Sequence, residues 1–322
     1  MSKPYVFVTR KLPDEALRPL KERYNIKVWP DELKACDRKT LLEEAKKADA
    51  LLTMLSDQID RELLSQAKHL KVVANLAVGY DNIDLNAANE YGVTVTNTPH
   101  ILNDTTADLT FALLLATARR IPESINYVKE GKWTSWGPLL LAGSDVHHKT
   151  IGIVGMGNIG EAIAKRASGF DMTILYHNRN RKTDAEKRLN AKYVSFDELL
   201  KQSDFVVSMT PLTEETKEMF NADAFSKMKE SAIFINTSRG GVVDEKALYE
   251  ALKSKQIKAC GLDVFQEEPI SKDHPLLELD NVVALPHIGS SSVETRMAMM
   301  ELTVNNIINV LEGDEPLTAV KK

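Results

Sequence analysis

Residues 150–160 read Thr-Ile-Gly-Ile-Val-Gly-Met-Gly-Asn-Ile-Gly, and they are the most informative segment for predicting the fold. It begins with a short apolar run, Ile151–Val154, that predicts a buried strand, and a helical pattern follows at Glu161–Ser168. The glycines between them form a G-x-G-x-x-G sequence, whose successive members permit a tight turn, close approach of a pyrophosphate and close packing of helix on strand. The helix N-terminus offers N–H groups to phosphates. We therefore predict a dinucleotide site, and a glycine turn that serves packing alone is the alternative.

Short apolar runs alternate with helical patterns on both sides of this stretch. The strands predicted before it are Tyr5–Thr9, Lys27–Trp29, Ala50–Met54, Val72–Leu76 and Val93–Val95. Those predicted after it are Thr173–Tyr176, Phe205–Met209, Ala232–Asn236, Ala259–Leu262 and Val282–Leu285. Such alternation is typical of parallel sheets with helices on both faces. The length of 322 residues indicates two domains.

Two long helices are predicted outside these runs. The first begins near Asp104, bridges the two series and carries on one face Leu109, Leu113 and Ala116. The second covers residues 293 to about 311, and we expect it to return to the first domain, because the second has no remaining face to cover. Residues 195–198, Ser-Phe-Asp-Glu, form a capping box that opens a further helix.

The composition excludes several classes of protein. A formal net charge of -5 argues against a nucleic-acid partner, which needs a concentrated basic face. The apolar runs fall short of the roughly 20 residues of a membrane helix, and the N-terminus lacks the pattern of a secretory leader. Cys36 and Cys260 have neither pairing nor metal-ligand spacing. We therefore predict buried thiols, no structural metal and a cytoplasmic location.

The strand after the glycine stretch indicates which dinucleotide binds. It runs into residues 175–182, Leu-Tyr-His-Asn-Arg-Asn-Arg-Lys, without the carboxylate that usually bonds the ribose 2′-hydroxyl of NAD. Arg179, with Arg181 or Lys182, could instead pair with the 2′-phosphate of NADP. The sequence favours NADP, with NAD as a weaker second cofactor. A solvated basic loop is the alternative.

Charged or titratable side chains directly follow the last three predicted strands: Arg239, then Asp263 and Glu268, then His287. In an open parallel sheet these strand ends line one crevice. Reduction of a 2-keto acid needs a proton for the carbonyl oxygen, which a histidine can supply near neutral pH. Glu268 would stabilise the imidazolium, and Arg239 would hold the substrate carboxylate and polarise the carbonyl. Taken singly, each has a structural alternative: a core histidine, a surface ion pair and a turn at Glu268-Pro269.

These segments closely resemble the D-isomer-specific 2-hydroxyacid dehydrogenase family, in particular its glyoxylate/hydroxypyruvate reductase branch, which is similar to 2-ketogluconate reductases. The resemblance covers nearly the whole chain and rests on Val154–Gly160, Asn236–Gly240, Gly261–Phe265, Glu268-Pro269 and Leu285–Gly289. It implies an α/β fold with two doubly wound parallel-sheet domains. A Rossmann NAD(P)-binding domain of residues 101–287 would be inserted into a flavodoxin-like substrate domain of residues 1–100 and 288–322. The implied activity is the NADPH-dependent reduction of glyoxylate and hydroxypyruvate.

The resemblance also implies the role of individual residues. The catalytic residues would be Arg239, Glu268 and His287. The cofactor would be bound by Gly155, Met156, Gly157, Asn158, Ile159, Gly160, Asn178, Arg179, Asn180, Thr106, Thr210, Pro211, Thr237, Ser238, Arg239, Asp263, His287 and Gly289, of which Asp263 would contact the nicotinamide carboxamide. The substrate would be bound by Leu55, Ser56, Val78, Gly79, Arg239 and His287, with its carboxylate on the backbone amides of the loop at 78–79.

One departure from the family lies in the loop that begins at Trp136. Animal members place a second tryptophan where this chain has Leu140, and that tryptophan reaches the partner subunit's substrate site. Leu140 leaves the substrate end more open, so a 2-ketogluconate reductase or another D-2-hydroxyacid dehydrogenase is the main alternative. The family is usually dimeric, and we expect a homodimer that buries Leu139–Ala142 and the bridging helix. Packing of that run inside its own domain is the alternative.

Two other functions on this scaffold fit the sequence less well. A nucleotide-sensing corepressor would be expected to carry interaction-bearing tails, whereas this chain ends soon after its last predicted helix. A formate or phosphite dehydrogenase oxidises a substrate without a carbonyl and normally favours NAD, against the basic loop around Arg179.

Overall fold

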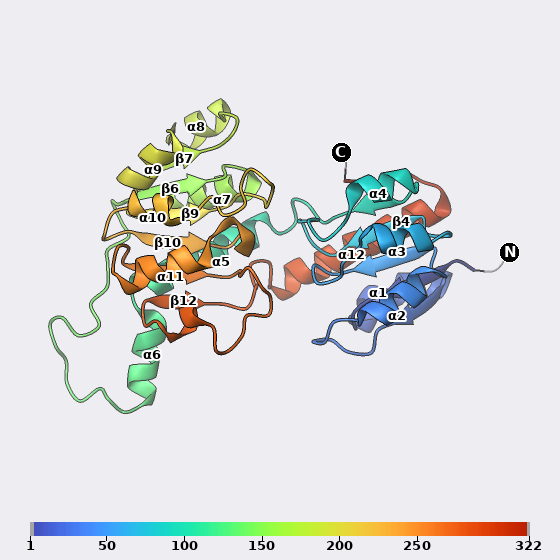
Figure 1. Ribbon diagram of the computed structural model, residues 1–322, viewed down its shortest axis with the longest axis horizontal. Coiled ribbons are helices and arrows are strands. Elements are labelled where there is room, and N and C mark those ends of the chain that lie inside the picture. Colours follow the sequence, from blue (N-terminus) through green and yellow to red (C-terminus); the bar gives the residue numbers. More distant parts are fainter. Residues whose placement is uncertain (1–2, 321–322) are drawn as a thin grey trace. The chain divides into compact units, whose positions relative to one another are not determined.

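The computed structural model describes residues 3–320, which form two compact units (Figure 1). Unit 1 contains the chain up to Leu102 and again from Ser292, and unit 2 is Asn103–Ser291. The sequence predicts domain boundaries at 100/101 and 287/288. The predicted substrate domain also includes residues 1–2 and 321–322, which lie outside the described residues.

Unit 1 is built on a five-stranded parallel sheet in the order β2-β1-β3-β4-β5. The strands are β1 (Tyr5–Val8), β2 (Asn25–Val28), β3 (Ala50–Thr53), β4 (Val72–Asn75) and β5 (Thr94–Thr96). The order corresponds to the flavodoxin-like, doubly wound arrangement, in which ligands bind beyond the carboxyl ends of the strands. All residues of β3 and β4 are buried, because helices cover both faces of the sheet.

The helices of unit 1 are α1 (Asp14–Arg23), α2 (Arg38–Ala45), α3 (Arg61–Gln66), α4 (Leu85–Glu90) and α12 (Val293–Glu312). Aspartate or serine side chains accept a backbone N–H at the start of four of them, α2, α3, α4 and α12. The long predicted final helix, α12, packs against α1, β3 and β4. Its predicted return to the first domain is confirmed.

Unit 2 holds a seven-stranded parallel sheet in the order β12-β11-β10-β9-β6-β7-β8. The strands are β6 (Thr150–Val154), β7 (Thr173–His177), β8 (Ala191–Tyr193), β9 (Phe205–Ser208), β10 (Ile233–Asn236), β11 (Ala259–Leu262) and β12 (Val282–Ala284). The strand order reverses between β6 and β9, which is the switch point where Rossmann-type sheets bind dinucleotides. Two doubly wound parallel sheets confirm the predicted fold class.

The helices of unit 2 are α5 (Asn103–Ala118), α6 (Ile121–Lys129), α7 (Asn158–Ser168), α8 (Thr183–Leu189), α9 (Phe196–Gln202), α10 (Ala222–Ser226) and α11 (Glu245–Lys253), with short 3-10 turns η1 (Gly240–Val242) and η2 (Pro275–Glu278). The capping box at Ser195 opens α9 as predicted. The predicted apolar face of α5 is only partly right, since Leu113 is buried but Leu109 and Ala116 are half-buried. The helix contacts both α7 and the sheet, so its buried face is broader and turned from the predicted one.

Two apolar cores lie on opposite faces of the unit 2 sheet. Phe205 and Val207 belong to one core, and Val206 between them belongs to the other. Successive strand residues point to opposite faces, so this alternation shows that the sheet is covered on both sides. No helix within residues 3–320 is long and apolar enough to cross a membrane.

Candidate active site

The glycine loop lies between β6 and α7 at the carboxyl edge of the unit 2 sheet. Gly155 has a φ of +105°, and a Cβ there would lie 2.6 Å from the backbone of Met209. A Cβ on Gly160 would lie 2.3 Å from the carbonyl oxygen of Gly155, so this glycine allows the helix to pack on the strand. A Cβ on Gly157 would meet no atom within 4 Å. The second glycine therefore leaves open space in front of the helix N-terminus, which fits a bound pyrophosphate.

Helix α7 begins at Asn158, three residues before the predicted start, because Gly157 takes an extended conformation as its N-cap. Asn178, at the end of β7, fixes the loop: its Oδ1 accepts a 2.9 Å hydrogen bond from the Met156 N–H, and its Nδ2 donates to the Met156 carbonyl at 3.4 Å. Asn178 thus orients the backbone that would face a phosphate. Ile159, in the first turn of α7, is half-buried.

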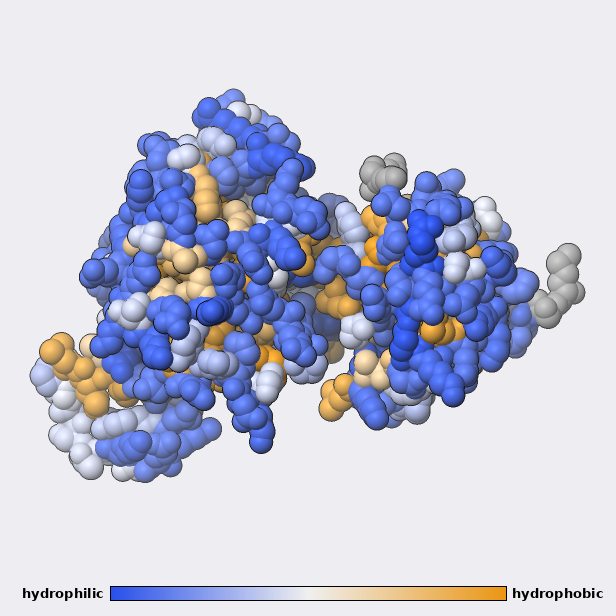
Figure 2. Space-filling model, in the orientation of Figure 1, coloured by the Kyte–Doolittle hydropathy of each residue, from blue (hydrophilic) through white to orange (hydrophobic). Residues whose placement is uncertain are grey.

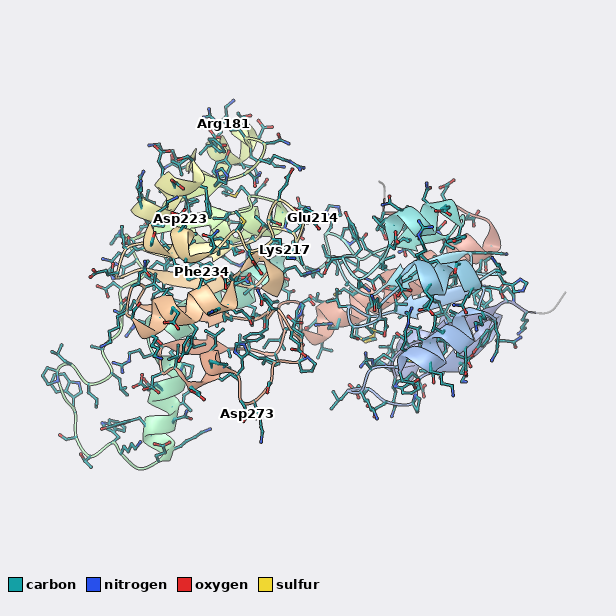
Figure 3. All side chains as sticks on the ribbon, viewed as in Figure 1. Arg181, Glu214, Lys217, Asp223, Phe234 and Asp273 are labelled. Atoms are coloured by element: carbon teal, nitrogen blue, oxygen red, sulfur yellow. The ribbon has the colours of Figure 1, made fainter. Side chains whose placement is uncertain are left out.

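The arginines of the basic segment after β7 differ in how firmly they are held by neighbouring carboxylates. Arg181, beside α8 (Figure 3), donates to both Glu186 oxygens at 2.7 and 2.8 Å, and this pairing lowers the pKa of Glu186 to about 2. Arg179 is 82% exposed and makes only a loose 3.7 Å contact with Glu215, which is 76% exposed. An exposed pair of this kind contributes little and can be exchanged for another anion. Asn180 is also exposed, so Arg179 is the guanidinium of this segment best able to meet a phosphate.

The turn that carries Arg239 is shaped by Asn236, the last residue of β10. Its Oδ1 accepts hydrogen bonds from the Ser238 N–H and hydroxyl, at 3.1 and 2.9 Å, and its Nδ2 donates to the Arg239 carbonyl at 2.9 Å. A Cβ on Gly240 would lie 1.8 Å from the carbonyl carbon of Phe265. The Arg239 turn therefore packs directly against the segment leading to Glu268. An asparagine at a strand end before a polar turn is the signal that could have marked this residue.

Glu268 and His287 form a hydrogen-bonded pair, with 2.6 Å between Oε2 of Glu268 and Nδ1 of His287. The other carboxylate oxygen accepts the Phe265 N–H at 3.0 Å. Burial alone would raise the pKa of Glu268, but the hydrogen bond from His287 and the nearby charges of His287 and Arg239 outweigh it and hold this pKa below its usual value. An ionised carboxylate only accepts hydrogen bonds, so Nδ1 carries a proton and Nε2 remains for the substrate.

Asp263, at the end of β11, holds the backbone next to His287. Its carboxylate is fully buried, and Oδ1 accepts the Ile288 N–H at 2.8 Å. Oδ2 has no hydrogen-bond partner among residues 3–320. Burial raises the pKa of Asp263, although the Ile288 N–H opposes this. A buried acceptor without a donor is costly, and the amide of a nicotinamide would supply that donor, so the residues present fit this cofactor.

Other predicted cofactor residues lie around this acceptor and the neighbouring strand ends. A Cβ on Gly289 would lie 3.3 Å from Oδ2 of Asp263 and 3.4 Å from Thr106. The hydroxyls of Thr237 and Ser238 are engaged with Thr110 and Ser208, at 2.6 and 3.2 Å. Two further predicted residues follow β9: the Thr210 hydroxyl donates to the Met219 sulfur at 3.7 Å, and the Pro211 carbonyl accepts from Thr216 at 2.6 Å.

The predicted substrate residues of unit 1 follow β3 and β4 at the carboxyl edge of its sheet. The Val78 carbonyl accepts a 2.7 Å hydrogen bond from Asn97, and the Gly79 carbonyl accepts one of 2.9 Å from Asn75. In a trans peptide the N–H points away from the C=O, so the Gly79 N–H points away from Asn97. Leu55 and Ser56 lie on the neighbouring loop after β3.

Asn82 joins these two loops of unit 1. Its Nδ2 donates to the carbonyls of Asp57 and Met54, at 2.8 and 3.2 Å. Sequence reasoning assigned no role to Asn82, because its partners become visible only once β3 and β4 are paired. Unit 2 thus brings together Arg239, Glu268, His287 and the cofactor residues, and unit 1 brings together the four other substrate residues. Within residues 3–320 no cluster of His, Cys, Asp or Glu has the arrangement of a metal site.

The comparisons with known proteins show the family to which the chain belongs. The family model described as "D-isomer specific 2-hydroxyacid dehydrogenase, NAD binding domain" matches residues 111–289. The chain belongs to the D-isomer specific 2-hydroxyacid dehydrogenase family and is an NAD(P)-dependent oxidoreductase.

Similar individual proteins match over almost their whole length. The glyoxylate reductase of Korarchaeum cryptofilum is 49% identical over 321 residues, which cover 99% of this chain and 96% of that protein. The crystal structure of the TT0316 protein from Thermus thermophilus has a TM-score of 0.92 at 45% identity, covering 98% of this chain and 100% of that one. An NADPH-dependent glyoxylate/hydroxypyruvate reductase from Sinorhizobium meliloti, solved with NADP and malonate, has a TM-score of 0.89 at 32% identity and covers 99% and 97%.

Proposed function

We propose that this enzyme reduces small 2-keto acids, glyoxylate and hydroxypyruvate in particular, with NADPH as the preferred reductant. The observation that carries the proposal is the 2.6 Å pair between ionised Glu268 and His287, on the same strand edge as Arg239 and the glycine loop. The names of the similar reductases from Korarchaeum cryptofilum and Sinorhizobium meliloti support it.

Each residue of the site has a chemical task in this reaction. A bound reduced nicotinamide supplies the hydride for the keto carbon. His287 gives the proton to the keto oxygen from Nε2, and Glu268 stabilises the imidazolium through Nδ1. Arg239 binds the carboxylate and polarises the carbonyl through its planar guanidinium. In unit 1, the backbone N–H groups of the Val78–Gly79 loop are the ones we propose for binding a substrate carboxylate.

The cofactor preference rests on the end of β7. No carboxylate follows this strand directly, whereas exposed Arg179 does. A carboxylate there would repel a 2′-phosphate, and a guanidinium binds one through charge-assisted hydrogen bonds. The glycine loop and the unpartnered Oδ2 of Asp263 would hold the remainder of the dinucleotide.

We also propose that the working form is a homodimer in the cytoplasm. Unit 2 exposes apolar side chains on α6 and the loop that follows: Ile121, Ile125, Val128, Trp133, Trp136, Leu139 and Leu140. Figure 2 shows an orange group at the outer end of this part of the molecule, beside white and blue residues. Large exposed apolar patches mark protein interfaces. Cys36 and Cys260 are free and buried, as suits a reducing compartment.

The experiment that tests the proposed function is an initial-rate panel. Glyoxylate, hydroxypyruvate, pyruvate and 2-ketogluconate are offered with NADPH and, in parallel, with NADH. We expect the highest kcat/KM with glyoxylate or hydroxypyruvate, and higher values with NADPH. If 2-ketogluconate were turned over fastest, it would replace glyoxylate and hydroxypyruvate as the assigned substrate. That result would fit the more open substrate end expected from Leu140, which is 41% exposed and stands where animal members have a tryptophan. No turnover of any acid despite NADPH binding would contradict the enzymatic role.

A further inference from the structure

Arg10 lies at the carboxyl edge of the unit 1 sheet, two residues after the end of β1. It stands beside the predicted substrate residues, because β1, β3 and β4 are neighbours in the sheet and all end at this edge. The Nη2 of Arg10 donates a 2.7 Å hydrogen bond to the Ser56 hydroxyl on the loop after β3. A guanidinium therefore contacts one of the substrate residues of unit 1.

The charge of this guanidinium is not neutralised by an ion pair. Arg10 forms no salt bridge with any carboxylate of residues 3–320, and its buried Nε has no hydrogen-bond partner there. The nearby carboxylate of Asp57 forms no hydrogen bond with Arg10: Oδ2 accepts from the Thr9 hydroxyl and from the Met54 N–H, and buried Oδ1 has no hydrogen-bond partner among residues 3–320. The buried Nε is a costly donor without an acceptor, whereas the end of the guanidinium that donates to Ser56 is exposed and can meet an anion.

The position of Arg10 fits the far end of a substrate rather than its reacting end. Adjacent strands lie about 4.8 Å apart, so the ends of β1 and β4 are separated by about 10 Å. A keto acid whose first carboxylate lies on the Val78–Gly79 loop after β4 must extend past the Ser56 loop to approach Arg10. The two carbons of glyoxylate do not span this distance, whereas a four-carbon chain met by an arginine side chain does.

We propose that Arg10 binds the distal carboxylate of dicarboxylic 2-keto acids and so widens the substrate range of the enzyme to this class. The proposal rests on the proposed reductase function and deepens it. The reaction itself is unchanged: hydride goes to the keto carbon, a proton goes to the keto oxygen, and the distal carboxylate takes no part. Binding through Nη1 and Nη2 would give the parallel two-bond geometry that guanidinium and carboxylate favour.

The test compares three substrates in the wild-type enzyme and in Arg10→Gln with saturating NADPH. Oxaloacetate carries the distal carboxylate, 2-oxobutyrate has a methyl group in its place, and glyoxylate has no distal group. We expect the wild type to prefer oxaloacetate over 2-oxobutyrate at least tenfold in kcat/KM. In Arg10→Gln this preference should fall at least tenfold, while kcat/KM for glyoxylate falls less than threefold, because glyoxylate has no distal group for Arg10 to bind.

The control is Lys11→Gln, which removes the same charge from the next, exposed residue and should keep the preference for oxaloacetate. Equal losses of kcat/KM for all three substrates in Arg10→Gln would overturn the proposal, because they would show that Arg10 only stabilises the loop that carries Ser56. An unchanged preference, or a wild type that reduces glyoxylate but not oxaloacetate, would also overturn it while the proposed function stands. A wild type that reduces none of the acids would remove the proposed function, and this proposal with it.

Discussion

His287 has a left-handed backbone conformation, with φ at +55°. For a residue with a Cβ this conformation costs on the order of 1–3 kcal/mol, so the surrounding structure must impose it. The hydrogen bond from the Ile288 N–H to buried Asp263 holds the peptide that follows, and Glu268 holds the ring. The segment after β11 thus supports His287, which follows β12, at both its backbone and its ring. Such over-determination is typical of a catalytic group rather than of a core histidine.

Replacing Glu268 with Gln should slow the reduction and remove the loss of rate in acid. The pKa of Glu268 is held below its usual value, so its charge is present throughout neutral pH and is lost only in acid, below the usual glutamate range. Without that carboxylate the His287 ring loses its partner at Nδ1, and the variant should lack the acid limb that protonation of Glu268 gives the wild-type kcat/KM profile. The rate at neutral pH should fall about tenfold or more. Glu267→Gln, at the exposed neighbouring residue, is the control, and an identical profile in the two variants would contradict the pairing.

Replacing Arg179 with Gln should weaken the enzyme's preference for NADPH. Loss of a charge-assisted contact to the 2′-phosphate should raise KM for NADPH about tenfold and leave KM for NADH within twofold. Steady-state kinetics with both cofactors measures this. Lys187→Gln, on the exposed face of α8, removes the same charge without reaching the end of β7. Equal changes for the two cofactors in Arg179→Gln would refute the role of Arg179.

At the scale of elements, the periodicity of apolar residues predicts the strands well, because buried parallel strands are short continuous apolar runs. It misses β8, whose three residues include the exposed Lys192, and it places the start of α7 too late, because Gly157 acts as an N-cap without a side chain. Burial of α5 on two neighbouring sides depends on α7, which no local pattern contains. The Asn236 and Asn82 networks depend likewise on partners that only strand pairing brings near.

Replacing Gly240 with Ala should disturb the turn after β10, where Arg239 packs against the segment that leads to Glu268. The added Cβ would lie 1.8 Å from the Phe265 carbonyl carbon, so the turn must move away from β11. We expect a loss of about 1–3 kcal/mol in stability and, because Arg239 and Glu268 shift together, at least a tenfold loss in kcat. In the control Gly241→Ala, the Cβ would meet only the flexible Leu212 side chain at 3.0 Å. Thermal unfolding and initial rates that match between the two variants would show that the close packing is unimportant.

At the scale of the whole molecule, the apolar band on α6 and its loop predicts association of two chains. Sedimentation equilibrium should give a mass near twice that of the 35.9 kDa chain. Leu139→Glu, at a side chain that is 81% exposed in the single chain, should shift the equilibrium toward monomer, because a buried unpaired charge costs several kcal/mol. A monomeric wild type would remove the dimer from the account and leave the chemistry of unit 2 intact.

The two-sheet architecture and the three catalytic candidates follow from motifs that lie at strand ends, where topology gathers side chains that are far apart in the sequence. The unpaired charge of Arg10 and the unpartnered oxygen of Asp263 could not be predicted in this way. Whether a buried polar atom has a hydrogen-bond partner depends on how the whole chain packs around it. A sequence motif shows which chemical groups lie close together along the chain, whereas a donor or acceptor without a partner can be identified only in the folded structure.

The most direct test of the account is the His287→Ala enzyme, assayed for glyoxylate reduction and, separately, for NADPH affinity by fluorescence titration. A proton donor contributes about 10²–10⁴-fold, so kcat should fall by that factor while the Kd for NADPH stays within threefold. His274→Ala, at a histidine of the same unit that caps η2, should keep both values. Near-normal turnover in His287→Ala would contradict the central claim that the Glu268–His287 pair delivers the proton.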